Sequence, residues 1–106
     1  MIVTTSETIA GKRIVKTLGL VKGNTVRARH VGRDIAAGLR TIIGGEVREY
    51  TKLLAESREQ SIDRMVEDAR AVGANAIIAL RFGTSQTMKS AAELLAYGTA
   101  VIIEDE

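Results

Sequence analysis

The chain has 106 residues, of which 45% are hydrophobic, and a formal net charge of +2 at pH 7. It contains no cysteine, which excludes disulfides and thiolate metal sites. Only Tyr50, Phe82 and Tyr97 are aromatic, so we expect an aliphatic core in one domain over residues 1–106. The longest nearly apolar run, residues 94–103, is too short to span a bilayer, and the first residues do not resemble a signal peptide. We therefore expect a cytoplasmic protein without a membrane partner.

Charge is divided unevenly along the chain. Residues 1–40 hold eight lysines or arginines against two acidic residues, a net +6, whereas residues 41–106 hold seven against eleven, a net −4. Arginine binds phosphate well, but no aromatic residue interleaves the basic segment and no known nucleic-acid-binding motif is present. A nucleic-acid partner is therefore disfavoured. Solvated faces explain the charges most simply, and steering between subunits is the alternative.

The first third of the chain predicts strands followed by a short helix. Residues 2–5 read as a short strand. Residues 13–22 and 25–31 read as a hairpin closed by a two-residue turn at Gly23-Asn24. A slim helix is expected over residues 33–43, because its apolar residues recur at helical spacing beside small residues.

A long amphipathic helix is predicted over residues 46–72. Its apolar residues recur at steps of three and four, and the opposite face is charged, which is typical of a solvated face. Ser57 and Ser61 interrupt the apolar stripe and indicate the close approach of another backbone. The glycine pair 44–45 permits a tight turn before the helix, and Gly73 occupies the position that often ends one.

Two further strands are predicted after the helix, over residues 75–84 and 93–103. In the first, alternation places Ala76, Ile78, Leu80 and Phe82 on one face. In the second, both faces are largely apolar, a pattern usual for a strand buried on both sides. Because helices can cover only one side of so small a sheet, we expect another subunit to cover the other side. Residues 104–106 are expected to fray.

Three segments carry a resemblance to a known family: RDIAAGLRTIIGGEVREYTKLL from residue 33, GANAIIALRF from residue 73 and YGTAV from residue 97. In this order and spacing they resemble the YbjQ-like family, small prokaryotic proteins labelled as heavy-metal-binding. The resemblance implies one YbjQ-like domain over residues 1–106. It also implies an α+β, dodecin-like or YbjQ-like subunit, with an antiparallel sheet and two helices, in a homo-oligomeric ring of five subunits. It carries over no catalytic residue.

The metal label directs attention to the available ligands, which include His30, Asp34, Glu46, Glu49 and the acidic tail. Of these, His30, Glu46 and Glu49 are the candidate metal ligands. One histidine with scattered carboxylates is a poor site for a soft metal. A ring axis could nevertheless collect several copies of one carboxylate, so a metal site shared between subunits is the alternative hypothesis.

Our leading hypothesis is a non-enzymatic oligomer that binds a ligand or serves as a scaffold. The serines lack a nucleophile motif, and His30 is the only histidine available as a base. An enzyme acting on a small polar substrate is the third hypothesis. For a polar ligand, the candidate residues lie in the family-like stretch: Arg33, Asp34, Arg40 and Tyr50.

Overall fold

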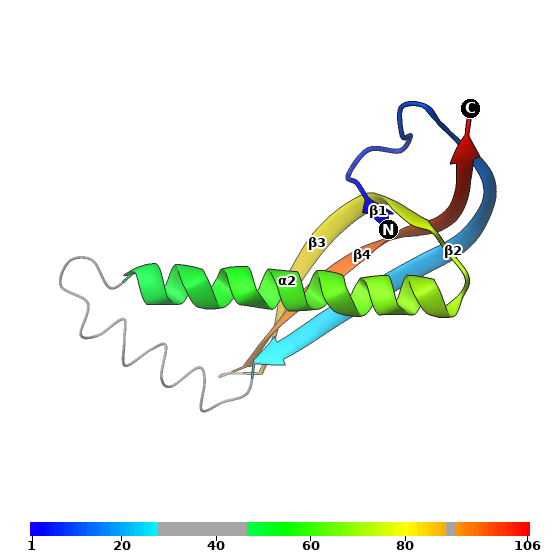
Figure 1. The fold of residues 1–106 in the computed structure, drawn as a ribbon. Coiled ribbons are helices and arrows are strands. Elements are labelled where there is room, and N and C mark those ends of the chain that lie inside the picture. The colour runs from blue at the N-terminus through cyan, green and yellow to red at the C-terminus, as the bar shows by residue number, and fades with distance from the viewer. Residues whose placement is uncertain (28–46, 89–90) are drawn as a thin grey trace.

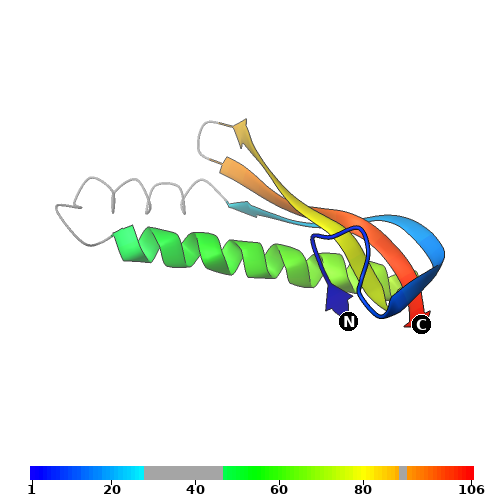
Figure 2. The ribbon, with the colours of Figure 1, turned by 90° about the horizontal axis from the view of Figure 1, so that it is seen from above.

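The structure is a computed structural model that describes residues 1–27, 47–88 and 91–106, with side chains described outside residues 26–27, 47–51, 53, 86–88 and 91–92. It contains, in chain order, β1 (Ile2–Val3), β2 (Lys12–Arg27), α2 (Val47–Ala71), β3 (Ala76–Met88) and β4 (Ala91–Asp105). The strands form one sheet in the order β1-β3-β4-β2, and α2 lies along one face of it (Figures 1 and 2). The α+β class and the long helix are confirmed. The expected helix at 33–43 and the glycine turn before α2 lie outside the described residues.

The sheet is mixed, so the prediction of a purely antiparallel sheet is wrong. β4 pairs antiparallel with both β2 and β3, but β1 pairs parallel with β3 through Ile2 opposite Ala76 and Val3 opposite Ile77. Parallel neighbours need a long connection. Here β2 and α2 both lie between β1 and β3 in the chain, which supplies it.

The hairpin predicted at Gly23-Asn24 is also wrong, because β2 runs through both residues as one strand. Gly23 serves close packing instead: a Cβ added there would collide with the backbone of Ser61 and Met65 on α2. The close backbone approach predicted from the serines is thus confirmed, with Ser57 and Ser61 both buried. The signal that reads as a turn is a glycine that lets a helix cross a strand.

The core lies between α2 and the sheet. Met65 and Ala69 of α2 are fully buried against Val21 of β2 and the small residues Ala96 and Ala100 of β4. The helix lies mainly over β2 and β4 and hardly touches β3. It ends at Gly73, whose φ of +85° is the left-handed conformation that glycine adopts without strain, as its sequence position predicts.

A bulge in β3 changes which side chains share a face. The register shifts between Ile78 and Arg81, where Ala79 has a positive φ of 55°. Ala76 and Ile78 therefore face away from α2, whereas Leu80 packs in the core with α2. The single apolar face predicted from simple alternation is thus split in two, because an extra residue in one strand reverses the pattern beyond it.

The C-terminus is held in the sheet, which corrects the expectation that residues 104–106 fray. Glu104 and Asp105 end β4 and form ion pairs with Arg13 and Lys12 of β2. The Glu106 N–H also donates to the Gly11 carbonyl at 3.1 Å.

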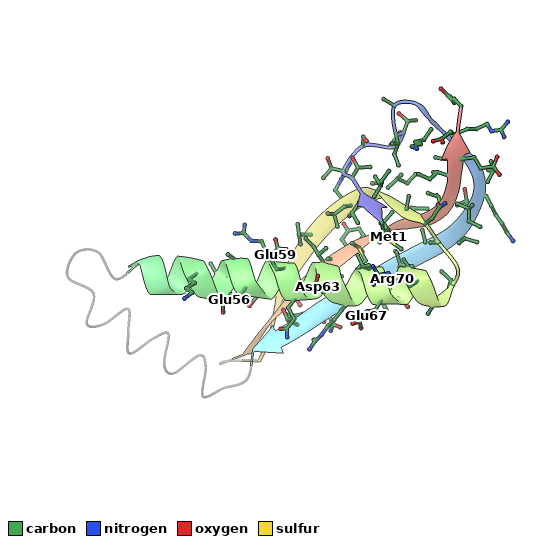
Figure 3. The ribbon with its side chains drawn as sticks, in the orientation of Figure 1. Met1, Glu56, Glu59, Asp63, Glu67 and Arg70 are labelled. Atoms are coloured by element: carbon green, nitrogen blue, oxygen red, sulfur yellow. The ribbon has the colours of Figure 1, made fainter. Side chains whose placement is uncertain are left out.

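The outer face of α2 is charged and exposed, as predicted for a solvated face, and carries Lys52 and Arg70 besides its carboxylates. Glu56, Glu59, Asp63 and Glu67 lie along it, one or two turns apart (Figure 3). Within the described part of the chain, no helix is long and apolar enough to cross a membrane.

Candidate functional site

The sheet face opposite α2 divides into a covered end and a bare end. At the covered end Ala76, Val101 and Ile103 are buried, and Ile9 and Ile14 pack against them. Because Ile9 belongs to the segment between β1 and β2, the chain covers this end of the face itself.

The bare end is built from three rows of side chains across β2, β4 and β3. Register places Leu20 opposite Thr99 and Ile78, Lys22 opposite Tyr97 and Arg81, and Asn24 opposite Leu95 and Gly83. Cross-strand partners share a face, and these alternate with core residues such as Val21, Gly23, Ala96 and Gly98. Ile78 packs against the covered end. We call the other eight residues the bare face: Leu20, Lys22, Asn24, Arg81, Gly83, Leu95, Tyr97 and Thr99.

Large apolar side chains are exposed on the bare face. Leu20 is 71% exposed and Tyr97 is 37% exposed. The Tyr97 ring lies over Gly83, since a Cβ added to that glycine would stand 3.9 Å from the ring carbon Cε1. Because Gly83 has no side chain, the Tyr97 ring can lie against the backbone of β3.

Two cations flank Tyr97. Arg81 is fixed, because its Nη1 donates to the carbonyls of Thr5 at 2.9 Å and of Leu80 at 2.7 Å. Lys22 lies on the opposite strand and is exposed. The centre of the bare face thus combines an aromatic ring with positive charge on both sides.

A carboxylate marks the polar end of this surface. Glu93 accepts a hydrogen bond from the Asn24 side-chain amide at 3.0 Å and one from the Ser85 hydroxyl at 3.4 Å. These bonds tie β2 and β3 together across β4. The result is an exposed surface with an apolar end, a cationic centre and an acidic margin, suited to docking a complementary surface.

None of the candidate residues that the sequence suggested for ligand or metal binding has a described side chain. His30, Arg33, Asp34, Arg40 and Glu46 lie outside the described residues. Glu49 and Tyr50 lie near the start of α2, but their side chains are also outside the description. Their assignments therefore stay predictions.

The described residues do not fit a heavy-metal site. Residues 1–27, 47–88 and 91–106 contain no group of three or more histidine, cysteine or carboxylate side chains close enough to hold a metal ion. The carboxylates of the ion-paired C-terminus are separate, each bound to its own cation. Lys12 donates a hydrogen bond to Asp105, and this bond, together with the Lys12 charge, lowers the pKa of Asp105 below its usual value.

Comparison with known proteins agrees with the fold and the resemblance. The model of the YbjQ family, described as "Putative heavy-metal-binding", matches residues 1–104. A UPF0145 protein of Dehalococcoides mccartyi is 59% identical over 104 residues, covering 98% of this chain and all of the relative. A UPF0145 protein of Methanosarcina acetivorans is 57% identical over 103 residues, 97% of each chain.

A solved structure shares the fold. The crystal structure of a protein of unknown function from Pediococcus pentosaceus, of the DUF74 family, matches with a TM-score of 0.64 at 16% identity and covers 98% of both chains. Together with the family match, these similarities show an α+β protein of a widespread prokaryotic class. The chain belongs to the YbjQ family.

Proposed function

We propose that this protein is a non-enzymatic homo-oligomer, assembled as a ring, that binds a ligand or serves as a scaffold. The observation that carries the proposal is the bare face, where Leu20 is 71% exposed at the centre of a strand. Burying a leucine side chain stabilises by about 1.5–3 kcal/mol. A second subunit on this face would gain that free energy, and Tyr97 would add to it.

The charges of the bare face favour a ring over a twofold dimer. In a twofold contact the bare face would meet itself, and the cations Lys22 and Arg81 would approach their own copies. A head-to-tail contact brings the bare face against a different surface, and such contacts close into rings. The carboxylates on the outer face of α2 offer the opposite charge on the same chain. Family resemblance adds the expectation of five subunits.

The non-enzymatic part of the proposal has a separate basis. It stands on the lack of a nucleophile motif in the sequence. A ring of such subunits would offer repeated copies of each surface, which is useful for holding a ligand or partner at several points.

The test is a charge placed in the bare face. Leu20→Lys should break the ring and lower the native mass to no more than that of two chains, each of 11.4 kDa. Val72→Lys is the matched control, because Val72 is 50% exposed just beyond the end of α2. We expect it to keep the wild-type native mass. A wild-type protein that is monomeric at micromolar concentration would defeat the proposal.

The alternative is a metal site shared between subunits, and the description of the family model favours it. Such a site would use several copies of His30, Glu46 or Glu49 around the ring axis. Native mass spectrometry with elemental analysis of the same sample decides the matter. A ring with stoichiometric metal supports the alternative, and a metal-free ring that divalent metals do not stabilise removes it.

A further inference from the structure

The outer edge of β3 is open over half its length. At its start β1 pairs with Ala76 and Ile77, and the next residues of the N-terminal segment continue the cover. The Ala79 N–H donates to the Ser6 carbonyl at 2.9 Å, and the Leu80 N–H donates to the Thr4 carbonyl at 3.0 Å. From Phe82 to Met88, no described strand or loop pairs with this edge.

The direction of the Leu80 N–H shows which backbone groups this edge presents. The Leu80 N–H points away from β4, toward the Thr4 carbonyl. The next residue, Arg81, is the register partner of Tyr97 on β4. Because successive N–H groups along a strand point to opposite sides, those of Phe82, Thr84 and Gln86 point outward. The edge thus presents a row of donors and acceptors ready to pair with a strand.

This edge also lacks the features that keep strands from pairing. Residues 82–88 read FGTSQTM, without a charge or a proline. Proteins usually protect long edges with lysine, proline or a bulge. One register shift of β3 lies before this segment, and a second falls near its end, between Gln86 and Met88. α2 hardly touches β3, and Figure 2 shows the far end of β3 standing away from the helix. From Phe82 to Gln86, no charge, proline, bulge or covering element among the described residues blocks the approach of another chain.

The other edge of the sheet is closed where α2 crosses it. The Lys22 N–H donates to the Asp68 carboxylate at 3.1 Å, and Nη1 of Arg64 donates to the Asn24 carbonyl at 2.5 Å. Helix side chains thus occupy the outward groups of Lys22 and Asn24. The earlier part of β2 is interrupted by register shifts between Ile14 and Lys16 and between Thr17 and Gly19. Among the described residues, β3 is therefore the edge better suited to pair with another copy.

We propose that residues 82–86 of β3 pair antiparallel with the same segment of a second copy. An uncharged segment can meet itself without like-charge repulsion, and opposed threonines and serines stabilise such pairs. This twofold contact is independent of the proposed ring. If the ring forms, the edge joins subunits of two rings, and the native mass is twice that of one ring.

Substitutions at Thr84 test whether the β3 edge pairs with another copy, and they leave the backbone hydrogen bonds between β3 and β4 intact. Thr84→Pro removes an outward N–H, and Thr84→Lys places a charge on an exposed position of the edge. Both should halve the native mass, whereas the matched control Thr84→Val, which keeps the branched shape and the backbone donor, should not. Circular dichroism verifies that each variant folds. If Thr84→Pro does not fold, the test relies on Thr84→Lys.

Hydrogen exchange gives a second readout that does not depend on mass. In the wild type the amides of Phe82 and Gln86 should be protected, and in Thr84→Lys they should exchange rapidly. Rapid exchange in the wild type, with a native mass equal to that of Thr84→Lys, overturns the inference. The native mass of Leu20→Lys separates the two interfaces, because this variant should lose the ring but keep the β3 edge. A dimer supports pairing through β3, and a monomer refutes it.

Discussion

The two faces of the sheet differ in what the chain supplies to cover them. On the helix face, α2 lies so close that only glycine is tolerated at position 23, and Met65 is fully buried. On the opposite face, the chain covers one end with Ile9 and leaves Leu20 71% exposed at the other. Stability therefore resides on the helix face, and we propose that the bare face serves assembly. The predictions below separate these two roles.

Shortening a core side chain should have the largest effect. Met65→Ala removes a fully buried side chain from the helix face and should lower the free energy of unfolding by about 2–5 kcal/mol. Leu20→Ala should change the stability of the isolated subunit by less than about 0.5 kcal/mol, because the side chain is already exposed. Urea unfolding at low protein concentration measures both. Equal losses would contradict the division between the faces.

The two faces should also respond differently to an added methyl group. Gly23→Ala places a Cβ against the backbone of α2 and should cost about 1–3 kcal/mol or more. Gly83→Ala is the matched control on the bare face, where the nearest atom is a Tyr97 ring carbon at 3.9 Å. It should be neutral or stabilising by about 0.4–1 kcal/mol. Thermal melts of the two variants, compared with the wild type, test this contrast.

A smaller loss is expected from the buried hydroxyl of α2. The Ser61 Oγ lies 3.2 Å from the Thr25 hydroxyl and donates to the Leu94 carbonyl at 3.1 Å. Ser61→Ala would leave those groups without this partner and should cost about 1–3 kcal/mol. Ser85→Ala, which removes an exposed hydroxyl from the bare side, should have little effect. If the two losses were equal, the buried bond would contribute nothing.

The weakest effect should be the pH dependence of the C-terminal ion pair. Lys12 lowers the pKa of Asp105 in the folded state. The resulting stability is present above the unfolded pKa and is lost as pH falls through the lower, folded value. Since Asp105 is exposed, the effect on stability is small. Carboxyl NMR titration should show the pKa of Asp105 rising in Lys12→Gln, and an unchanged value would show that the pair is not formed in solution.

Local patterns predicted the long helix well and the strands less well. The apolar period of three and four, with Gly73 after it, located α2, and the two serines indicated its close contact with a backbone. The sequence could not show that Gly23 packs under this helix, since glycine followed by asparagine is equally typical of a hairpin turn. Nor could it reveal the bulge at Ala79, because an extra residue leaves the composition of a strand unchanged.

The functional surface was only partly predictable. Alternation placed Tyr97 and its neighbours on one face of the last strand and indicated that a partner covers it. It could not tell that Ile9 covers Val101 and Ile103 while Leu20 and Tyr97 stay bare, because that depends on the path of the N-terminal segment. Lys22 and Arg81 lie on either side of Tyr97 because of the strand register, and the sequence of each strand by itself does not reveal that register.

The most direct test of the proposed assembly is the accessibility of position 20 in the native protein. The chain has no cysteine, so Leu20→Cys and Val72→Cys each introduce one thiol into a clean background. We predict that the thiol at position 20 reacts with a soluble maleimide far more slowly than the one at position 72, and equally fast once urea has unfolded the protein. Equal rates in the native protein would show that no subunit covers the bare face.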